Sequence, residues 1–397
     1  FVLIAFRQDR VAIDNALRAL WMNQIGGIAI LAAVLSALYG SSPLTLHEMI
    51  ASGGGWVSLG AVCIAAAALI KGAMIPFERW LLGAMVAPTP VSAMLHSATM
   101  VKLSPFVILK LSPLLAGTPG GAIIAIAGGL CFAAAAYLAL SRTWLKEILG
   151  YSTIALLGLM AALATLGNIQ SLHIVMALMG FHALSKALLF LSAGVLEKNH
   201  GLKYVDDMAG LVEKDPKSAF FIIFGFVSLT LPPFGLFVGK LLAIESVASQ
   251  LPSQPWLIVL LLSLLIGSVL LVLLYFKIAS ALLSAPSDIL TLNPAPMEKG
   301  FMIPMALLSL AIIGIAVWFT LVENALYLFL PAVLMLAALY GKRSMERLDR
   351  VKTYQCGESA PFETVPVRFE ASARLQTFMA IGFASLFILL IASGVLS

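Results

Sequence analysis

Long apolar stretches alternate with short polar connections along the whole chain. Stretches of about 20 apolar residues are long enough to cross the hydrocarbon core of a bilayer as helices. The pattern predicts eleven membrane spans, preceded by a partial span at FVLIAF. The expected ranges are near 16–40, 55–74, 90–112, 119–140, 147–166, 170–195, 218–248, 255–282, 301–321, 323–341 and 375–396.

Two of these stretches contain helix-breaking residues. LIKGAMIPFERWLLGAMVAPTPVSAM predicts a helix, a short amphipathic piece and a new span, and Pro232 and Pro233 halve the stretch 218–248. A proline inside a helix costs about 3 kcal/mol, and backbone groups freed within a membrane must face protein or water. We expect two broken helices beside a functional site, although simple kinks in packed helices would leave the same pattern.

Composition agrees with an all-α polytopic membrane protein. The chain is 61% hydrophobic and 11% charged, with a mean hydropathy of +1.03, whereas soluble domains carry about 25% charged residues. The net charge of +5 is spread over separate loops, which argues against nucleic-acid binding.

The basic residues predict the orientation. Of the 24 lysine and arginine residues, 19 fall in or beside alternate loops. The other five are Lys110 and four lysines within apolar stretches. Loops rich in lysine and arginine lie on the cytoplasmic side of a cell (inner) membrane. We therefore expect the charged loops to be cytoplasmic and Ser397 to lie on the opposite side.

Cysteine usage predicts no cofactor in this chain. Cys63, Cys131 and Cys356 are isolated, and the sequence contains no CxxC motif or Cys/His cluster that would hold a metal or an iron–sulfur centre.

The first residues and the spans suggest the domain organisation. FVLIAF resembles the end of a span, so we expect a further N-terminal region. We predict one helix bundle over 1–282. A C-terminal part over 283–397 would contain spans 301–321, 323–341 and 375–396 and a cytoplasmic loop, 342–374.

Four lysines lie within the predicted spans. Insertion scales put a lysine at the centre of a membrane helix at about 2.5–3.5 kcal/mol, so each is a candidate functional group. Together they suggest a path for ions or protons. They are Lys71, Lys102, Lys186 and Lys240.

Two histidines accompany these lysines. His182 and Lys186 are four residues apart, on one helix face, so they could relay a proton or form a fixed buried pair. His96 and Lys102 are six residues apart and, on a continuous helix, would point in directions about 120° apart. His96 could instead be an ordinary core histidine, and Lys102 could extend to the membrane surface.

Acidic residues are scarce within the spans. Glu245 could receive a proton at an exit or lie at the interface as a helix-end residue. We expect Glu78 and Glu147 to form local ion pairs with Arg79 and Lys146, and His47 and His173 to be exposed.

Several segments resemble the antiporter-like proton-pumping subunits of respiratory complex I, multisubunit cation/proton antiporters and energy-converting nickel–iron hydrogenases. They are WLLGAMVAPTPVSAMLHSATMVK, GFHALSKALLFLSAG, VDDMAGLVEKDP and LPPFGLFVGKLLAIES. The resemblance covers about residues 1–280. It implies that the bundle over 1–282 translocates ions and has two inverted repeats of five helices, of which the first is incomplete in this sequence. Each repeat would have a broken helix that carries a lysine, here Lys71 or Lys240.

The resemblance also implies roles for other residues. His96 and Lys102 match protonatable positions of the next helix, and His182 and Lys186 match the central connection between half-channels. The family's glutamate partner of Lys71 would lie upstream of Phe1. The loop 342–374 is too short for the long lateral helix of the largest complex I subunit.

LPPFG and YQCGES are most similar to the hydrogenase branch, such as Ech-type, carbon-monoxide-linked or formate hydrogenlyase complexes. The expected function is proton pumping coupled to electron transfer in partner subunits, which would include other membrane subunits and a peripheral cytoplasmic redox arm. Nickel–iron and iron–sulfur centres are expected in those partners. The alternatives are membership of a redox-free sodium/proton antiporter complex, a structural membrane anchor and a stand-alone transporter.

Overall fold

The computed structural model describes residues 2–40, 45–52, 55–232, 234–284 and 299–322. The predicted spans 323–341 and 375–396 and the loop 342–374 lie outside these residues. The chain divides into two units, Phe1–Phe319 and Thr320–Ser397. The functional boundary predicted near residue 282 stays a prediction.

The described part of the chain is built from helices, which confirms the all-α prediction. Seven helical segments in it are long and apolar enough to cross a membrane, and one of these, Thr89–Leu115, comprises α5, η3 and α6. The longer helices are α1 (Arg10–Tyr39), α3 (Gly55–Lys71), α5 (Thr89–Ser97), α6 (Leu103–Leu115), α7 (Pro119–Ser141), α8 (Leu145–Ala164), α9 (Ile169–His200), α11 (Pro216–Thr230), α12 (Gly235–Gln250), α13 (Leu257–Leu283) and α14 (Lys299–Val322). The short elements are η1 (Ala5–Arg7), α2 (Leu46–Ser52), α4 (Arg79–Gly83), η2 (Ala84–Val86), η3 (Met100–Lys102), η4 (Asp206–Met208) and α10 (Leu211–Lys214).

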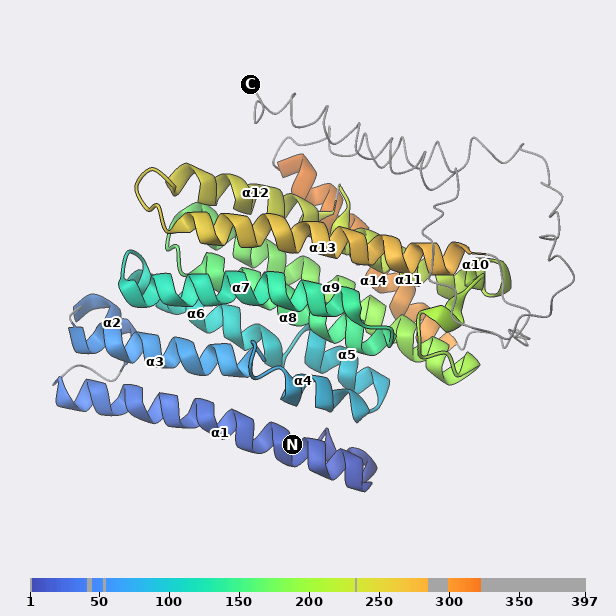
Figure 1. The fold of residues 1–397 in the computed structure, drawn as a ribbon, viewed down its shortest axis with the longest axis horizontal. Coiled ribbons are helices and arrows are strands. Elements are labelled where there is room, and N and C mark those ends of the chain that lie inside the picture. Colours follow the sequence, from blue (N-terminus) through green and yellow to red (C-terminus); the bar gives the residue numbers. More distant parts are fainter. Residues whose placement is uncertain (1, 41–44, 53–54, 233, 285–298, 323–397) are drawn as a thin grey trace, which may run out of the picture. The chain divides into compact units, whose positions relative to one another are not determined.

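Helix α8 forms the centre of the bundle formed by the first unit. Nearly all of its side chains are buried, and it packs against α6, α7 and α9. On one side α6 contacts α3, which contacts α1, and on the other side α9 contacts α11 and α12 (Figure 1). Because these neighbours enclose α8 and the face of α9 that packs on it, polar groups there are removed from any surrounding lipid or water, whereas His173 on α9 is exposed.

Two small residues allow α7 and α8 to approach closely. A Cβ on Gly128 would lie 2.7 Å from the carbonyl oxygen of Gly158, and a Cβ on Gly158 would lie 2.6 Å from that of Gly128. Small residues at helix interfaces let backbones come together in membrane proteins. This contact fixes the position of α8 against one side of the bundle.

Both predicted helix breaks are present. Helix α3 ends at Lys71 and is followed by the short α4, and α11 ends at Thr230 before α12 begins at Gly235. In each break a proline lacks the N–H that would continue the hydrogen-bond ladder. The first break also contains Ala73 at a φ of 56°.

The predicted span over 90–112 is confirmed, since Thr89–Leu115 is long and apolar enough to cross a membrane, but its helix is interrupted. Helix α5 ends at Ser97, and α6 begins at Leu103 after the 3₁₀ turn η3. The Oγ1 of Thr99 donates to the carbonyl oxygen of Met94 at 3.0 Å, and hydroxyls that bond nearby carbonyls compete with the helical ladder. Pro105, in the first turn of α6, has no N–H to donate to the preceding turn. The break rotates Lys102 away from the direction expected on a continuous helix.

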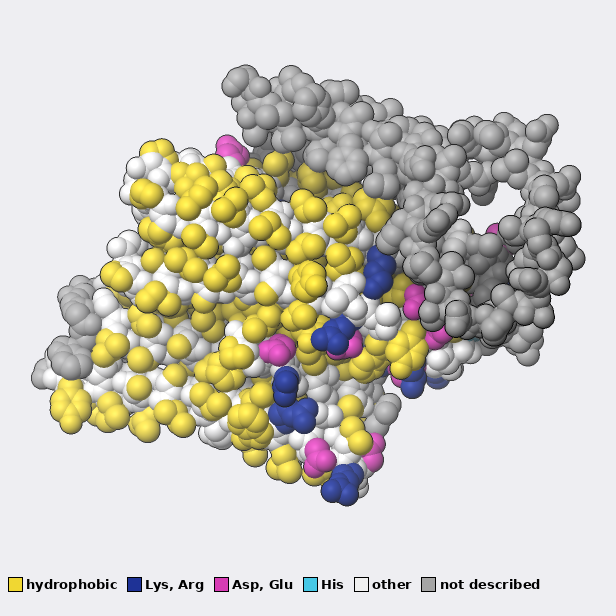
Figure 2. All heavy atoms as spheres, viewed as in Figure 1, with side chains coloured by type: hydrophobic (Ala, Val, Ile, Leu, Met, Phe, Trp, Pro, Cys, Tyr) yellow, Lys and Arg dark blue, Asp and Glu magenta, His cyan; other side chains and the backbone are white. Residues whose placement is uncertain are grey.

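Charged side chains gather toward one end of the described helices, while hydrophobic side chains cover most of the rest of the visible face (Figure 2). Ion pairs there join the ends of helices, such as Arg142 with Glu147 at 3.5 Å. Lys277 on α13 donates to the carbonyl oxygens of Leu140 and Arg142 at 2.8 and 2.6 Å and so caps the end of α7.

Asp215 joins two helices at this end. Its Oδ1 accepts a hydrogen bond from the Ser218 backbone N at 3.2 Å, which caps α11, and its Oδ2 lies 3.1 Å from Nε2 of His200 on α9. Burial alone would raise the pKa of Asp215, but hydrogen bonds from Ser218 and His200 offset that effect and hold the pKa below its ordinary value of 3.8. The carboxylate therefore stabilises the fold when it is ionised.

We expect Asp215→Asn to lower the thermal stability of the protein at pH 7, because the charged acceptor is lost. Since the folded-state pKa is depressed, the stabilisation is complete above the unfolded-state value and disappears as pH falls through the folded-state value. The difference in melting temperature between wild type and variant should therefore shrink below about pH 4. Thermal unfolding followed by size-exclusion chromatography measures this difference in melting temperature. A difference that stays constant from pH 7 to pH 3 would contradict the stabilising role of the ionised Asp215.

Candidate functional site

Helix α9 carries the buried polar centre of the bundle. His182, Ser185 and Lys186 lie on consecutive turns in the middle of the helix, and all three side chains are completely buried. Their flanking residues are apolar and pack against α5, α8, α11 and α12. The three polar groups must therefore find partners on those neighbouring helices.

Lys186 is bonded to α8. Its Nζ donates to the carbonyl oxygen of Leu149 at 3.0 Å and to the Oγ of Ser152 at 2.5 Å. No hydrogen bond joins Lys186 to His182 among the described residues, so the directly bonded relay considered from their spacing is absent in this arrangement. Ser152 is an acceptor for the central lysine that the sequence pattern did not indicate.

His182 is instead bonded to Lys102. The Nζ of Lys102 makes a hydrogen bond with the Nδ1 of His182 across the interface between η3 and α9. Lys102 and His182 belong to separate predicted spans and are 80 residues apart, and the break after Ser97 brings them together. When Nδ1 accepts this bond, the ring proton is on Nε2, which is buried and makes no other bond within the described residues.

His96 lies on α5 against the same part of α9. Its ring centroid is 4.6 Å from that of Phe190, and neither ring nitrogen makes a hydrogen bond to a described residue. The ring is completely buried. It is a group that can accept or release a proton, but it is not bonded directly to the Lys102–His182 pair.

The second helix break lies at the level of His182. Ser228 near the end of α11 donates to Ser185 on α9 at 2.7 Å, and Gly239 on α12 lies against Leu178. The end of α11 and the first turns of α12 therefore border the turn of α9 that holds His182. Lys240, buried and 4% exposed, follows Gly239, whose contact Leu178 lies eight residues, or about 12 Å, before Lys186 on α9.

The first helix break lies beside Lys102. A Cβ on Gly72 would lie 2.6 Å from the Oγ of Ser104, two residues after Lys102. The preceding residue, Lys71, has its Nζ 5.9 Å from the ring centroid of Trp80 and is only half-buried. Lys71, Lys102, His182 and Lys240 thus follow one another across the bundle, from α3 through η3 and α9 to α12.

The acidic residues lie elsewhere. Glu245 on α12 is exposed. His47 and His173 are also exposed, which confirms the prediction for the two histidines. The predicted partners of Glu147 and Glu78 were wrong. Glu147 pairs with Arg142, and the buried Oε2 of Glu78 makes no hydrogen bond in the described part of the chain.

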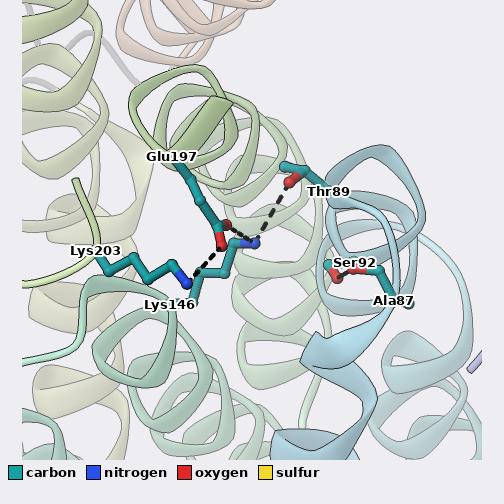
Figure 3. A network of polar contacts seen from close by, with 6 residues as sticks. All are labelled: Ala87, Thr89, Ser92, Lys146, Glu197 and Lys203. Carbon is teal, nitrogen blue, oxygen red and sulfur yellow. Dashed lines mark hydrogen bonds and ion pairs between the residues drawn. The ribbon is translucent and has the colours of Figure 1, made fainter. Parts of the chain in front are cut away.

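Lys146 is a further buried lysine, for which the sequence predicted only a local pair with Glu147. It bonds to Glu197 at the end of α9, and its Nζ lies 3.4 Å from the Oγ1 of Thr89 on α5 (Figure 3). Lys203 lies 3.8 Å from the same glutamate. This cluster connects the ends of α5, α8 and α9. No sequence spacing could indicate it, because Lys146 and Glu197 are on different helices.

Comparison with known proteins identifies the family. Residues 1–270 match the family described as NADH:quinone oxidoreductase/Mrp antiporter, TM. The chain belongs to this family. The resemblance predicted from its motifs is confirmed, and the chain is a multi-pass membrane protein with an antiporter-like fold. The two inverted five-helix repeats stay a prediction.

Relatives of this chain have two kinds of name. A protein of Rhizobium meliloti named as a probable component of a K(+)/H(+) antiporter is 35% identical over 228 residues, covering 55% of this chain and 23% of the relative. NADH-ubiquinone oxidoreductase chain 5 of Aedes aegypti is 32% identical over 203 residues, covering 50% and 34%.

A solved structure has a similar fold. A chain of the Mrp complex from Dietzia sp. DQ12-45-1b superposes with a TM-score of 0.69 at 26% identity, covering 97% of this chain and 40% of that chain. The present chain therefore spans less than half of the length of each of these three proteins.

The site offers proton donors and acceptors without a metal cage. Among the described residues, no group of three His, Cys, Asp or Glu side chains could hold a metal ion. The polar side chains brought together around α9 are lysine, histidine and serine groups, which donate or accept hydrogen bonds.

Ser152 gives a direct test of how Lys186 is held. We expect Ser152→Ala to destabilise the protein by about 1–3 kcal/mol, because a buried ammonium loses one of two acceptors. Ser192→Ala is the matched control, since the Oγ of Ser192 donates only to the Leu188 carbonyl of its own helix. Thermal unfolding of both purified variants measures the difference in stability. Equal losses of stability would show that the bond between Ser152 and Lys186 stabilises the protein no more than the hydrogen bond of Ser192 does.

Proposed function

We propose that this chain is a proton-translocating membrane subunit of a multisubunit complex. The observation that carries the proposal is the row formed by the half-buried Lys71 and the buried Lys102, His182 and Lys240, with Lys186 on the neighbouring turn of α9. Buried ionisable groups in membrane helices are costly and mark ion or proton pathways.

The geometry supports transfer along the row. Lys102 is bonded to His182, so a proton can pass between the ammonium and the imidazole without a large movement. The two helix breaks border the row on either side, and irregular backbone in a membrane helix is tolerated where it lines protein or a water-filled cavity. The breaks would supply the polar lining between the lysines at the two ends.

Glu245 and His96 have supporting roles in this proposal. Glu245 is exposed on α12, five residues beyond Lys240, and would exchange protons at the surface or with a neighbouring subunit. His96 would accept or donate protons beside α9. The charged helix ends would face the cytoplasm, in a cell (inner) membrane, following the positive-inside rule.

Two sources of energy can drive such a row. Electron transfer in partner subunits, including a peripheral redox arm with nickel–iron and iron–sulfur centres, is the source expected from the sequence resemblance. Exchange of a cation for protons is the second candidate, and it is favoured by relatives named as parts of cation/proton antiporters and by the similar chain in the Mrp complex.

We expect Lys186→Ala and Lys240→Ala each to reduce proton translocation by the reconstituted complex at least tenfold. The physical reason is that each substitution removes a proton-carrying group that no neighbouring side chain replaces. Fluorescence quenching of a pH-sensitive dye in proteoliposomes measures the rate.

Lys110→Ala is the matched control, because Lys110 is exposed on α6 and its Nζ lies 5.8 Å from the ring of Phe106. This variant should translocate protons at the wild-type rate. Wild-type rates in both buried-lysine variants would contradict the proposed function.

The metal content of the intact complex separates the two energy sources. Nickel and iron in the subunits that co-purify with this chain would identify an energy-converting hydrogenase, and iron alone would indicate another redox module. Only membrane subunits, without either metal, would identify a cation/proton antiporter.

A further inference from the structure

Asn23 on α1 has a buried acceptor without a donor. Its Nδ2 donates to the carbonyl oxygen of Ala19 at 2.7 Å, whereas its Oδ1 is buried and makes no hydrogen bond within the described residues. An amide oxygen left unpaired in an apolar environment costs about 1–3 kcal/mol. The adjacent Gln24, in contrast, is exposed.

The register of α1 against α3 places Asn23 level with Lys71. Ser36 and Ala33 of α1 lie against Gly60, and Gly26 lies against Ala67 and Ile70. The two helices are therefore antiparallel, and a step along one corresponds to an equal step back along the other. Three residues before Gly26, Asn23 faces the stretch 70–73 at the end of α3.

The side-chain amine of Lys71 is a hydrogen-bond donor without an acceptor among the described residues. Its Nζ makes no hydrogen bond or ion pair in the described part of the chain, and its one aromatic contact there is with Trp80 at 5.9 Å. The ring of Trp80 is itself fixed, because its Nε1 donates to the Ile70 carbonyl at 3.1 Å. An ammonium that is half-buried and unpaired requires an acceptor in its charged state.

We propose that the side-chain oxygen of Asn23 accepts a hydrogen bond from the Lys71 ammonium, directly or through one water molecule, and positions that lysine in its protonated state. The inference rests on the proposed function, because it assigns a positioning residue to the first lysine of the row. Asn23 is uncharged, so it holds the proton without fixing it as tightly as a carboxylate would.

Other charged groups lie on the elements that pack around this place. They are Arg10, Asp14 and Arg18 on α1, Glu78 and Arg79 at the start of α4, Lys102 on η3 and Lys110 on α6. None of them makes an ion pair with Lys71 among the described residues. Two of these groups could provide a negative charge. Asp14 is exposed and lies nine residues, or about 13 Å, before Asn23 on α1, and Glu78 lies within the break itself.

The test compares three variants of the full complex in proteoliposomes across a range of pH. Asn23→Asp places a carboxylate beside the ammonium and favours its charged form, so the alkaline limit of proton translocation should move upward by about one pH unit. Asn23→Leu should move that limit downward and slow translocation. Gln24→Glu introduces the same charge on the exposed side of α1 and should leave the limit unchanged.

A stability measurement covers the case in which a variant assembles poorly. In a double-mutant cycle, Asn23→Asp should raise the melting temperature of the complex when Lys71 is present and lower it in a Lys71→Met background. Equal effects in the two backgrounds would overturn the inference, as would equal pH shifts in Asn23→Asp and Gln24→Glu.

Different results would contradict the role of Asn23 and the proposed function. If Lys71→Met abolishes translocation while both Asn23 variants keep the wild-type pH profile, the proposed function stands and the role of Asn23 is wrong. If Lys71→Met translocates protons at the wild-type rate, Lys71 is not part of the path and both statements about this lysine are overturned.

Discussion

A buried ammonium group in an apolar helix bundle is stable only when acceptors on neighbouring helices meet it. This constraint explains the arrangement around α9. Lys186 is met by the Leu149 carbonyl and Ser152 on α8, and Lys102 is met by His182. Small residues also let helices approach closely in this bundle, as where Gly128 and Gly158 meet between α7 and α8. The bonds of Lys186 and Lys102 join α9 to α8 and to η3, so they connect helices and also carry the proposed proton chemistry.

The helix breaks position this chemistry. A continuous helix over 89–115 would direct Lys102 away from His182, and a continuous α11–α12 helix would leave no irregular backbone at the level of that histidine. Proline and hydroxyl groups produce the breaks by removing or competing for backbone hydrogen bonds. The protein thus places polar backbone and ionisable side chains together at membrane depth, where either would be costly alone.

Much of this architecture follows from the sequence because apolar length and proline position are local signals. They predicted the two proline breaks and those spans that lie within the described residues. The break after Ser97 was missed because Thr99 and Pro105 give a weaker signal than paired prolines. The Lys102–His182 and Lys146–Glu197 contacts could not be predicted by spacing, since each joins two helices whose relative rotation is fixed only by tertiary contacts. For the same reason, spacing could not predict Ser152 as the partner of Lys186.

The central claim is that protons cross the bundle through the bonded groups on η3 and α9. The most direct measurement is proton translocation by the reconstituted complex with His182→Leu, which removes the link to Lys102 but keeps every lysine. His200→Leu is the control, because His200 pairs with Asp215 at the charged end of the bundle. The account predicts at least a tenfold loss for His182→Leu and a nearly wild-type rate for His200→Leu. Equal rates in the two variants would contradict it.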